Sequence, residues 1–182
     1  IDLMQVEKVV LSHGHYDHTG GLKATLEPPG LVDIHAHDGV FTEKYRVVEG
    51  HEPIFIGNPW SKYQLEQWGA RLVLKRGPQE ITDRVMLTGE IPRTVGWETG
   101  DESFRIKSGG DYVEDPILDD QAMVMMSTLG PVVMVGCAHA GIVNTLKYVL
   151  KLIGEKKIYA VIGGLHLKEA GTQRIAKTIN IL

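Results

Sequence analysis

The sequence predicts a single α/β domain that spans residues 1–182, with sheets covered by helices in layers. Apolar runs of strand length alternate with segments of helical periodicity, which is the pattern of layered α/β folds. With 182 residues, 43% of them hydrophobic and 23% charged, the chain can bury a core. It contains no internal repeat and no stretch of linker composition, so we expect one domain.

The first part of the chain is predicted to alternate strands with short helices. The strands are expected at residues 6–12, 31–37 and 71–75, and the helices at 21–27 and 61–69. The second helix has clear ends, because Ser61 can cap its N-terminus and Gly69 can stop it. The helical spacing of Trp60, Tyr63 and Trp68 predicts that these rings pack in the core. The segment 41–49 is too short to assign.

The later part is predicted to begin irregularly and to end as regular α/β structure. Residues 76–118 carry Gly, Pro and charge at short intervals, which favours short strands and loops. Two apolar runs within 121–137 predict a β-hairpin whose strands are buried on both faces. After it we expect a helix from Gly141 to Gly154, a buried strand at 157–164 and a final helix at 169–182.

Charge and composition exclude several classes of protein. The net charge of −4, without a block of five like charges, gives no basic surface for nucleic acid or an anionic membrane. No apolar run reaches the 18 or so residues of a membrane span. A single cysteine allows no internal disulfide. The first residues lack the basic end and the apolar run of a signal peptide, so a cytoplasmic protein is expected. The expected partner is a small molecule, and a second copy of the chain is a further candidate.

The stretch LSHGHYDHTGG, at residues 11–21, holds three of the eight histidines. Residues two apart on an extended segment point the same way, so His13 and His15 are expected to bind one metal ion. The turn that follows would let Asp17 and His18 face a second ion. Two zinc ions about 3.5–4 Å apart can share a bridging hydroxide, and imidazole and carboxylate are both zinc ligands.

Two distant histidines take the same kind of position. His139 and His166, like His13, each lie just past an apolar strand in a loop that contains glycine. Strand ends in layered α/β folds converge on one edge, where ligand-binding groups gather. A solvated turn would explain a lone His-x-His, but not His-x-His-x-Asp-His at a strand end followed by Gly-Gly, so the sequence predicts a metal site at this loop and places His139 and His166 at comparable strand ends.

These motifs resemble a known family. LSHGHYDHTGG resembles the His-x-His-x-Asp-His signature of the metallo-β-lactamase superfamily, whose members are mostly binuclear metallohydrolases. GCAHAGIVN, DDQAMV, GGLHL and GEIPR resemble its branch named dihydropteroate-synthase-like or 7,8-dihydropterin-6-methyl-4-(β-D-ribofuranosyl)aminobenzene-5'-phosphate synthase. The resemblance implies a four-layer αββα sandwich with two metal ions. It implies one ion held by His13, His15 and His139, and the other by Asp17, His18 and His166.

The chain departs from the family pattern in two ways. Only ten residues precede the histidine stretch, so we expect a piece that lacks the N-terminal strands and a C-terminal tail. The family also has an aspartate that bridges both metals, yet no Asp or Glu lies between His139 and Glu155. Cys137 is the nearest substitute ligand, because a thiolate binds zinc, although a small core residue is the alternative. Asp119 and Asp120 are further candidates, unless they only cap a strand.

Other polar residues are candidates for binding the substrate. Arg93 in GEIPR could hold a phosphate or carboxylate with Glu90 orienting it, and a surface ion pair is the alternative. His37 is expected to line the pocket at a strand end. His35 is expected to be structural, since the two lack a third ligand for a separate metal site. His51 is expected on the surface.

The leading prediction is a metal-dependent hydrolase that uses a metal-bound hydroxide on a small anionic or pterin-like substrate. Asp17 would hold the hydroxide and pass on its proton. Two divalent ions are expected as cofactors, zinc first, with iron or manganese as alternatives. The branch name suggests a condensing transferase of pterin synthesis instead. A di-iron oxidoreductase, whose relatives carry glutamate at the position of His15, and a metal-binding module without hydrolytic activity remain as further alternatives.

Overall fold

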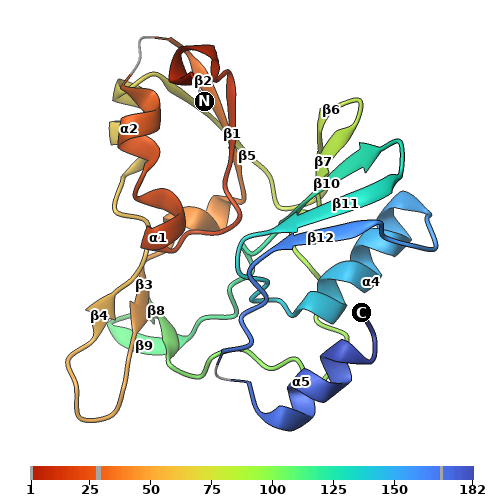
Figure 1. Ribbon diagram of the computed structural model, residues 1–182. Coiled ribbons are helices and arrows are strands. Elements are labelled where there is room, and N and C mark those ends of the chain that lie inside the picture. Colours follow the sequence, from red (N-terminus) through yellow and green to blue (C-terminus); the bar gives the residue numbers. More distant parts are fainter. Residues whose placement is uncertain (1, 28–29, 169) are drawn as a thin grey trace. The chain divides into compact units, whose positions relative to one another are not determined.

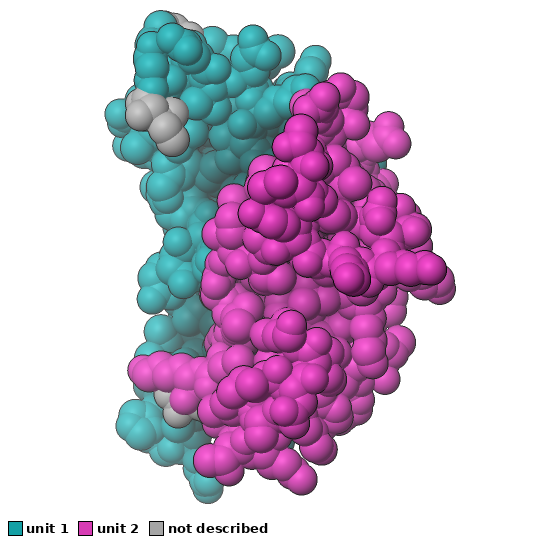
Figure 2. All heavy atoms as spheres, turned by 45° about the vertical axis from the view of Figure 1, so that its right-hand side comes forward, with its two compact units in different colours: residues 1–76, 101–119 teal, residues 77–100, 120–182 magenta. Residues whose placement is uncertain are grey.

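The structure is a computed structural model that describes residues 2–27, 30–168 and 170–182 (Figure 1). The chain divides into two compact units, each with its own sheets and core (Figure 2). Unit 1 comprises residues 1–76 and 101–119, and unit 2 comprises residues 77–100 and 120–182.

Unit 1 contains a parallel three-stranded sheet in the order β1-β2-β5. Its strands are β1 (Lys8–Val10), β2 (Val32–Ala36) and β5 (Ala70–Leu74). Parallel strands need crossover connections, and here these contain the helices α1 (Tyr16–Thr19), α2 (Leu22–Leu26) and α3 (Lys62–Gln67). Buried aliphatic side chains such as Ile34 and Leu65 form the core of this part. The three predicted strands and two predicted helices are confirmed; β5 is shifted by one residue, and the other four elements are shorter than predicted.

A second sheet of unit 1 is antiparallel, in the order β4-β3-β8-β9. Its strands are β3 (Lys44–Arg46), β4 (Ile54–Phe55), β8 (Phe104–Ser108) and β9 (Asp111–Glu114). The described residues of the unit also form two short 3₁₀ helices, η1 (Leu3–Gln5) and η2 (Asp38–Phe41). The unassigned segment 41–49 thus supplies β3, a strand too short for a periodicity argument.

The ends of α3 lie where the sequence places them. Ser61 and Gln64 form a reciprocal capping box, and Gly69 follows the helix with a positive φ of 90°. The rings of Trp60 and Trp68 lie 5.1 Å apart and pack against the core, as predicted. The same prediction was wrong for Tyr63, which is 69% exposed because its position on α3 faces away from the core.

Unit 2 is built on a five-stranded sheet in the order β12-β11-β10-β7-β6. The strands are β6 (Gln79–Thr82), β7 (Val85–Leu87), β10 (Ala122–Ser127), β11 (Gly130–Val135) and β12 (Ala160–Gly163). The helices are α4 (Ile142–Ile153) and α5 (Thr172–Ile179). Figure 1 shows α4 running beside the β11 and β12 part of this sheet. Its apolar side joins the core with Val124 and Val133.

The elements of unit 2 confirm most of the predicted ones. β10 and β11 form the antiparallel hairpin, and α4 ends at Gly154 in a left-handed conformation. The final helix begins later than predicted, and Glu169, where the prediction starts, lies outside the described residues. Among the described residues, no helix combines the length and the apolar character that a membrane span requires.

Two further predictions of burial were wrong. The hairpin strands are not buried on both faces, because alternate side chains such as Met126 and Met134 are exposed. The strand β12 is also largely exposed, with Ile162 at 50%. The reason is its place at the edge of the sheet, where among the described residues it pairs with β11 alone.

Candidate metal centre

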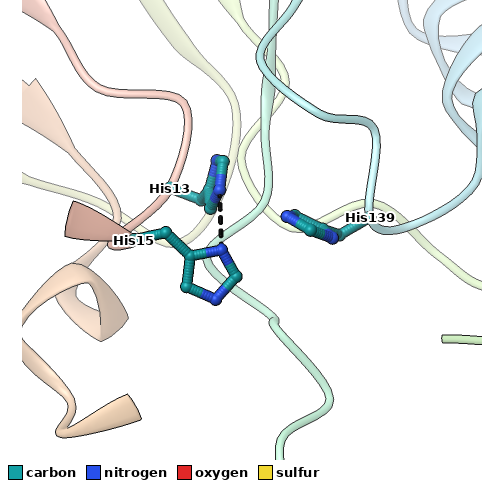
Figure 3. A group of neighbouring side chains, drawn as sticks. All are labelled: His13, His15 and His139. Carbon is teal, nitrogen blue, oxygen red and sulfur yellow. Dashed lines mark hydrogen bonds between the residues drawn. The ribbon is translucent and has the colours of Figure 1, made fainter. Parts of the chain in front are cut away.

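The histidine loop of unit 1 follows β1 and leads into α1. The backbone of Leu11 still bonds to β2, since its N–H donates to the carbonyl of His35 at 3.0 Å. Beyond that point the side chains of His13 and His15 are buried. His13 Nε2 and His15 Nδ1 lie 3.0 Å apart and face each other (Figure 3). The predicted turn after His15 is a single helical turn, α1.

Ser12 links two rings of the motif. Its hydroxyl lies 3.1 Å from His13 Nδ1 and 3.3 Å from His18 Nδ1. The contact at Nδ1 directs the other ring nitrogen of His13 toward His15, which is how an outer partner orients a metal ligand. His18 Nε2 lies 3.6 Å from a carboxylate oxygen of Asp17, and the Asp17 side chain is 59% exposed.

Burial also sets the protonation state of His15. Burial, followed by the positive charge of Lys44, lowers the pKa of His15 to about 4. At neutral pH the ring is therefore uncharged, which is the form that binds metal.

A buried ion network holds the backbone of the histidine loop. Lys44 Nζ donates to Asp115 Oδ2 at 2.9 Å and to Asp119 Oδ1 at 2.8 Å, and all three side chains are no more than 4% exposed. Asp119 Oδ2 accepts the N–H of Gly14 at 2.7 Å. Burial alone would lower the pKa of Lys44, but the carboxylates of Asp119 and Asp115 outweigh it and raise the pKa. Asp119 thereby fixes the residue between His13 and His15.

Gly14 has no room for a side chain. A Cβ there would lie 2.6 Å from the carbonyl oxygen of Val40 in η2. The same 3₁₀ helix is capped by His37, whose Nδ1 accepts the N–H of Gly39 at 2.9 Å. His37 and His35 are both buried in unit 1, and His51 is on the surface as predicted. η2 therefore packs directly against the loop that carries the two facing histidines.

In unit 2 the parallel pair β11 and β12 brings together three predicted site residues. The carboxyl ends of the two strands lie side by side, with Val135 opposite Gly163. The pairing continues beyond the strands, because the N–H of Gly164 donates to the carbonyl of Gly136 at 2.9 Å. Cys137 and His139 follow β11, and His166 follows β12. The donor atoms of Cys137, His139 and His166 all lie within 4.8 Å of one another.

The loop that carries His139 is held on several sides. Arg93 Nη1 donates to the carbonyl of His139 at 3.0 Å, and Asp120 Oδ2 accepts the N–H of Ala140 at 2.8 Å. Asn144 Nδ2 donates to the carbonyl of Ala140 at 2.8 Å. Arg93 and Asp120, which the sequence suggested as a substrate ligand and a metal ligand, here fix the backbone around His139.

Two non-glycine residues of this cluster adopt left-handed backbone conformations. Ala138 has φ = 53° and His166 has φ = 48°. Such conformations are unfavourable for residues with a Cβ and are concentrated at functional sites, where surrounding contacts hold them in place. The Ala138 conformation lies between Cys137 and His139, and the contacts of the following residues with Asp120 and Asn144 maintain it.

Replacing Gly163 with alanine is expected to damage this cluster. A Cβ at Gly163 would lie 1.9 Å from the carbonyl oxygen of Val135, and the φ of 130° also disfavours a side chain. We expect the free energy of unfolding to fall by about 2 kcal/mol, as overpacking and backbone strain typically cause. Denaturant unfolding would measure it, with Gly171→Ala as the control, because nothing lies within 4 Å of a Cβ there. Equal effects of the two changes would contradict the argument.

Sequence reasoning missed several residues that hold the histidines in place. Ser12 lies inside the quoted motif, and its contact with two rings could have been suspected from that position. Nothing in the sequence around Lys44 and Asp115 indicated that they are buried, because a lysine in a short strand is ordinarily expected at the surface. Glu98 was also missed. Its buried carboxylate accepts the N–H groups of Val143 and Asn144 at the start of α4.

Comparisons with known proteins identify similar chains. A family model described as the metallo-beta-lactamase superfamily matches residues 1–147. The chain is 32% identical to the 7,8-dihydropterin-6-methyl-4-(beta-D-ribofuranosyl)-aminobenzene-5'-phosphate synthase of Methanocaldococcus jannaschii, an alignment that covers 100% of this chain and 63% of that protein. It is 34% identical to an uncharacterized protein of the same organism, over 87% of this chain and 57% of that protein. The chain thus spans less than two thirds of the length of these relatives.

A solved structure has the same fold. The crystal structure of a metal-dependent hydrolase of the β-lactamase superfamily matches with a TM-score of 0.80 and 26% identity, over 96% of this chain and 62% of the other. The match confirms the predicted type of α/β fold.

Proposed function

The chain belongs to the metallo-β-lactamase superfamily, and from this premise we propose that it contributes the metal-binding site of a metal-dependent hydrolase. The proposed ligands are the six residues that the family resemblance implies: His13, His15, Asp17, His18, His139 and His166. They would hold two divalent ions, with zinc as the first candidate and iron or manganese as alternatives. The substrate would be a small molecule.

The facing nitrogens of His13 and His15 carry this proposal. Two imidazole nitrogens bound to one zinc ion at about 2.0–2.1 Å lie roughly 3.3 Å apart. The observed separation of 3.0 Å is close to this value. Ser12 also contacts the ring of His13, and Asp119 holds the backbone of Gly14 between the two histidines. The residues present therefore fit a metal ion.

The proposed chemistry divides between the metals and the protein. Zinc, when bound, acts as a Lewis acid and lowers the pKa of water to about 7. Asp17, whose side chain is largely exposed next to His18, would accept and pass on a proton. Arg93, exposed and held beside His139 through its carbonyl, would bind an anionic group of the substrate. Glu90 and His37 are proposed as further substrate contacts.

Metal analysis of the purified protein tests this function. We expect stoichiometric transition metal, and loss of hydrolytic activity on chelation that returns when zinc is added. His13→Ala and His15→Ala should each lower the metal content, whereas His51→Ala should not, because His51 lies on the surface. Full metal content in both site variants would contradict the assignment.

A condensing transferase is the second candidate function. It is favoured by the relative from Methanocaldococcus jannaschii, which is named a synthase and is 32% identical over the whole of this chain. The same residues would then activate a leaving diphosphate instead of water. Incubation with a dihydropterin diphosphate and a ribosylaminobenzene phosphate distinguishes the two. A transferase forms the coupled product, and a hydrolase releases only the alcohol.

A further inference from the structure

Unit 2 contains by itself three side chains whose donor atoms lie close enough together to hold a metal ion. Cys137 Sγ and one ring nitrogen of each of His139 and His166 lie within 4.8 Å of one another. In a tetrahedral site with zinc bonds of about 2.0–2.3 Å, the donor atoms are roughly 3.3–3.6 Å apart. Small side-chain rotations would bring the three atoms to that spacing, because the rings of His139 and His166 are already 4.5 Å apart.

We propose that Cys137, as a thiolate, binds one zinc ion together with His139 and His166. The inference rests on the proposed metal-dependent function, but it changes the ligand sets that the family pattern implies, in which His139 and His166 hold different ions. On binding, the S–H bond of Cys137 is replaced by an S–Zn bond, and the thiol proton passes to solvent. Three protein ligands leave a fourth position open, as in catalytic zinc sites.

The backbone conformation allows the segments that carry Cys137, His139 and His166 to lie close together. The ends of β11 and β12 are joined by the hydrogen bond from Gly164 to Gly136. A Cβ at Gly164 would lie 2.8 Å from the carbonyl oxygen of Gly136, so only glycine permits this spacing. Arg93 and Asp120 hold the loop on either side of Ala140 and His139. The ligands are therefore carried by two paired strand ends and not by a mobile turn.

The thiolate would determine which metal binds. Sulfur is a soft ligand that favours zinc over magnesium or manganese, which prefer oxygen. The thiolate also supplies a negative charge. The fifteen residues that follow His139 in the sequence contain no Asp or Glu that could supply one. Cys137 would in this way provide the anionic ligand that the family pattern assigns to an aspartate.

Cobalt substitution of the full chain tests the proposal. Because Cys137 is the only cysteine, a thiolate-to-cobalt charge-transfer band can arise only from this residue. We expect the band in the cobalt-loaded protein, its loss in Cys137→Ser, and its strong reduction in His139→Ala and His166→Ala. The His13→Ala and His15→Ala variants should keep the charge-transfer band, since His13 and His15 belong to unit 1 and are not among the three proposed ligands of this ion. Zinc binding to Cys137→Ser should be weaker by about 100-fold, the upper end of the loss seen when only an outer partner of a metal ligand is removed.

A second measurement uses the unmodified protein, so it does not depend on whether the variants fold. Zinc should slow the reaction of the Cys137 thiol with a disulfide reagent by at least about 10-fold, and a chelator should restore it. Magnesium should have no such effect. A cobalt-loaded protein without the charge-transfer band, or a thiol that zinc does not protect, would overturn the inference. Hydrolytic activity in a cobalt-loaded protein that lacks the charge-transfer band would contradict the role of Cys137 but not the proposed function. A charge-transfer band in a protein without hydrolytic activity would contradict the proposed function but not the role of Cys137.

Discussion

Replacement of Lys44 by methionine is expected to lower the free energy of unfolding by about 3–5 kcal/mol. Lys44 is 2% exposed and bonds to the carboxylates of Asp115 and Asp119, which are themselves buried. Methionine fills a similar volume but has no charge, so two carboxylates would remain buried without their cation. The cost of leaving buried charges unpaired exceeds what the ion pair itself contributes.

Denaturant unfolding of the metal-free protein measures this effect. The matched control is Lys107→Met, because Lys107 is an exposed lysine of β8, a strand that pairs with β3 in the same sheet. We expect a change within about 0.5 kcal/mol for the control. Adding Asp115→Asn and Asp119→Asn to Lys44→Met should recover part of the loss, since the uncompensated charges are then removed. A Lys44 variant as stable as the control would show that the network contributes little.

The Asp119→Asn substitution is expected to weaken metal binding by about 10–100-fold, the usual effect of losing a partner that orients metal ligands. Asp119 is the side chain that contacts both Lys44 and the backbone between His13 and His15. In asparagine one oxygen becomes an NH₂ group, so either the contact with Lys44 or that with Gly14 is lost. The loop would then lose part of its orientation even though every proposed ligand remains.

Asp115→Asn provides the matched control for that experiment. Asp115 also bonds to Lys44, but its other oxygen accepts the N–H of Ile117 and not that of Gly14. Both substitutions should lower stability by similar amounts, whereas only Asp119→Asn should reduce zinc affinity in a chelator competition. Equal zinc affinities of the two variants would mean that Asp119 has a structural role alone.

The ends of α3 and the positions of the histidines after strands could be predicted because their signals are local. Ser61 and Gly69 mark the ends of α3 through capping and a positive φ, both of which depend on neighbouring residues. The histidines after β1, β11 and β12 follow short apolar runs that can be seen without any tertiary information. Such short-range patterns can be recognised without knowing which segments pack together.

The failed predictions concern burial, which is not local. Ile162 in an apolar run looks like a core residue, yet it lies on an edge strand. Lys44 looks like a surface residue, yet it is among the most buried side chains of the protein. In each case the outcome depends on which elements pack nearby, and periodicity within one segment does not contain that information.

The sequence by itself determined which residues are candidates to bind metal, since the spacing of His13, His15, Asp17 and His18 and the strand-end positions of His139 and His166 are visible in the chain. Only the tertiary structure decided what holds them. Lys44 meets Asp115 and Asp119 across 71 and 75 residues, and Cys137 meets His166 through the pairing of β11 with β12. The physical reason is that ligand identity is a property of single side chains, whereas their orientation depends on contacts between segments that only folding brings together.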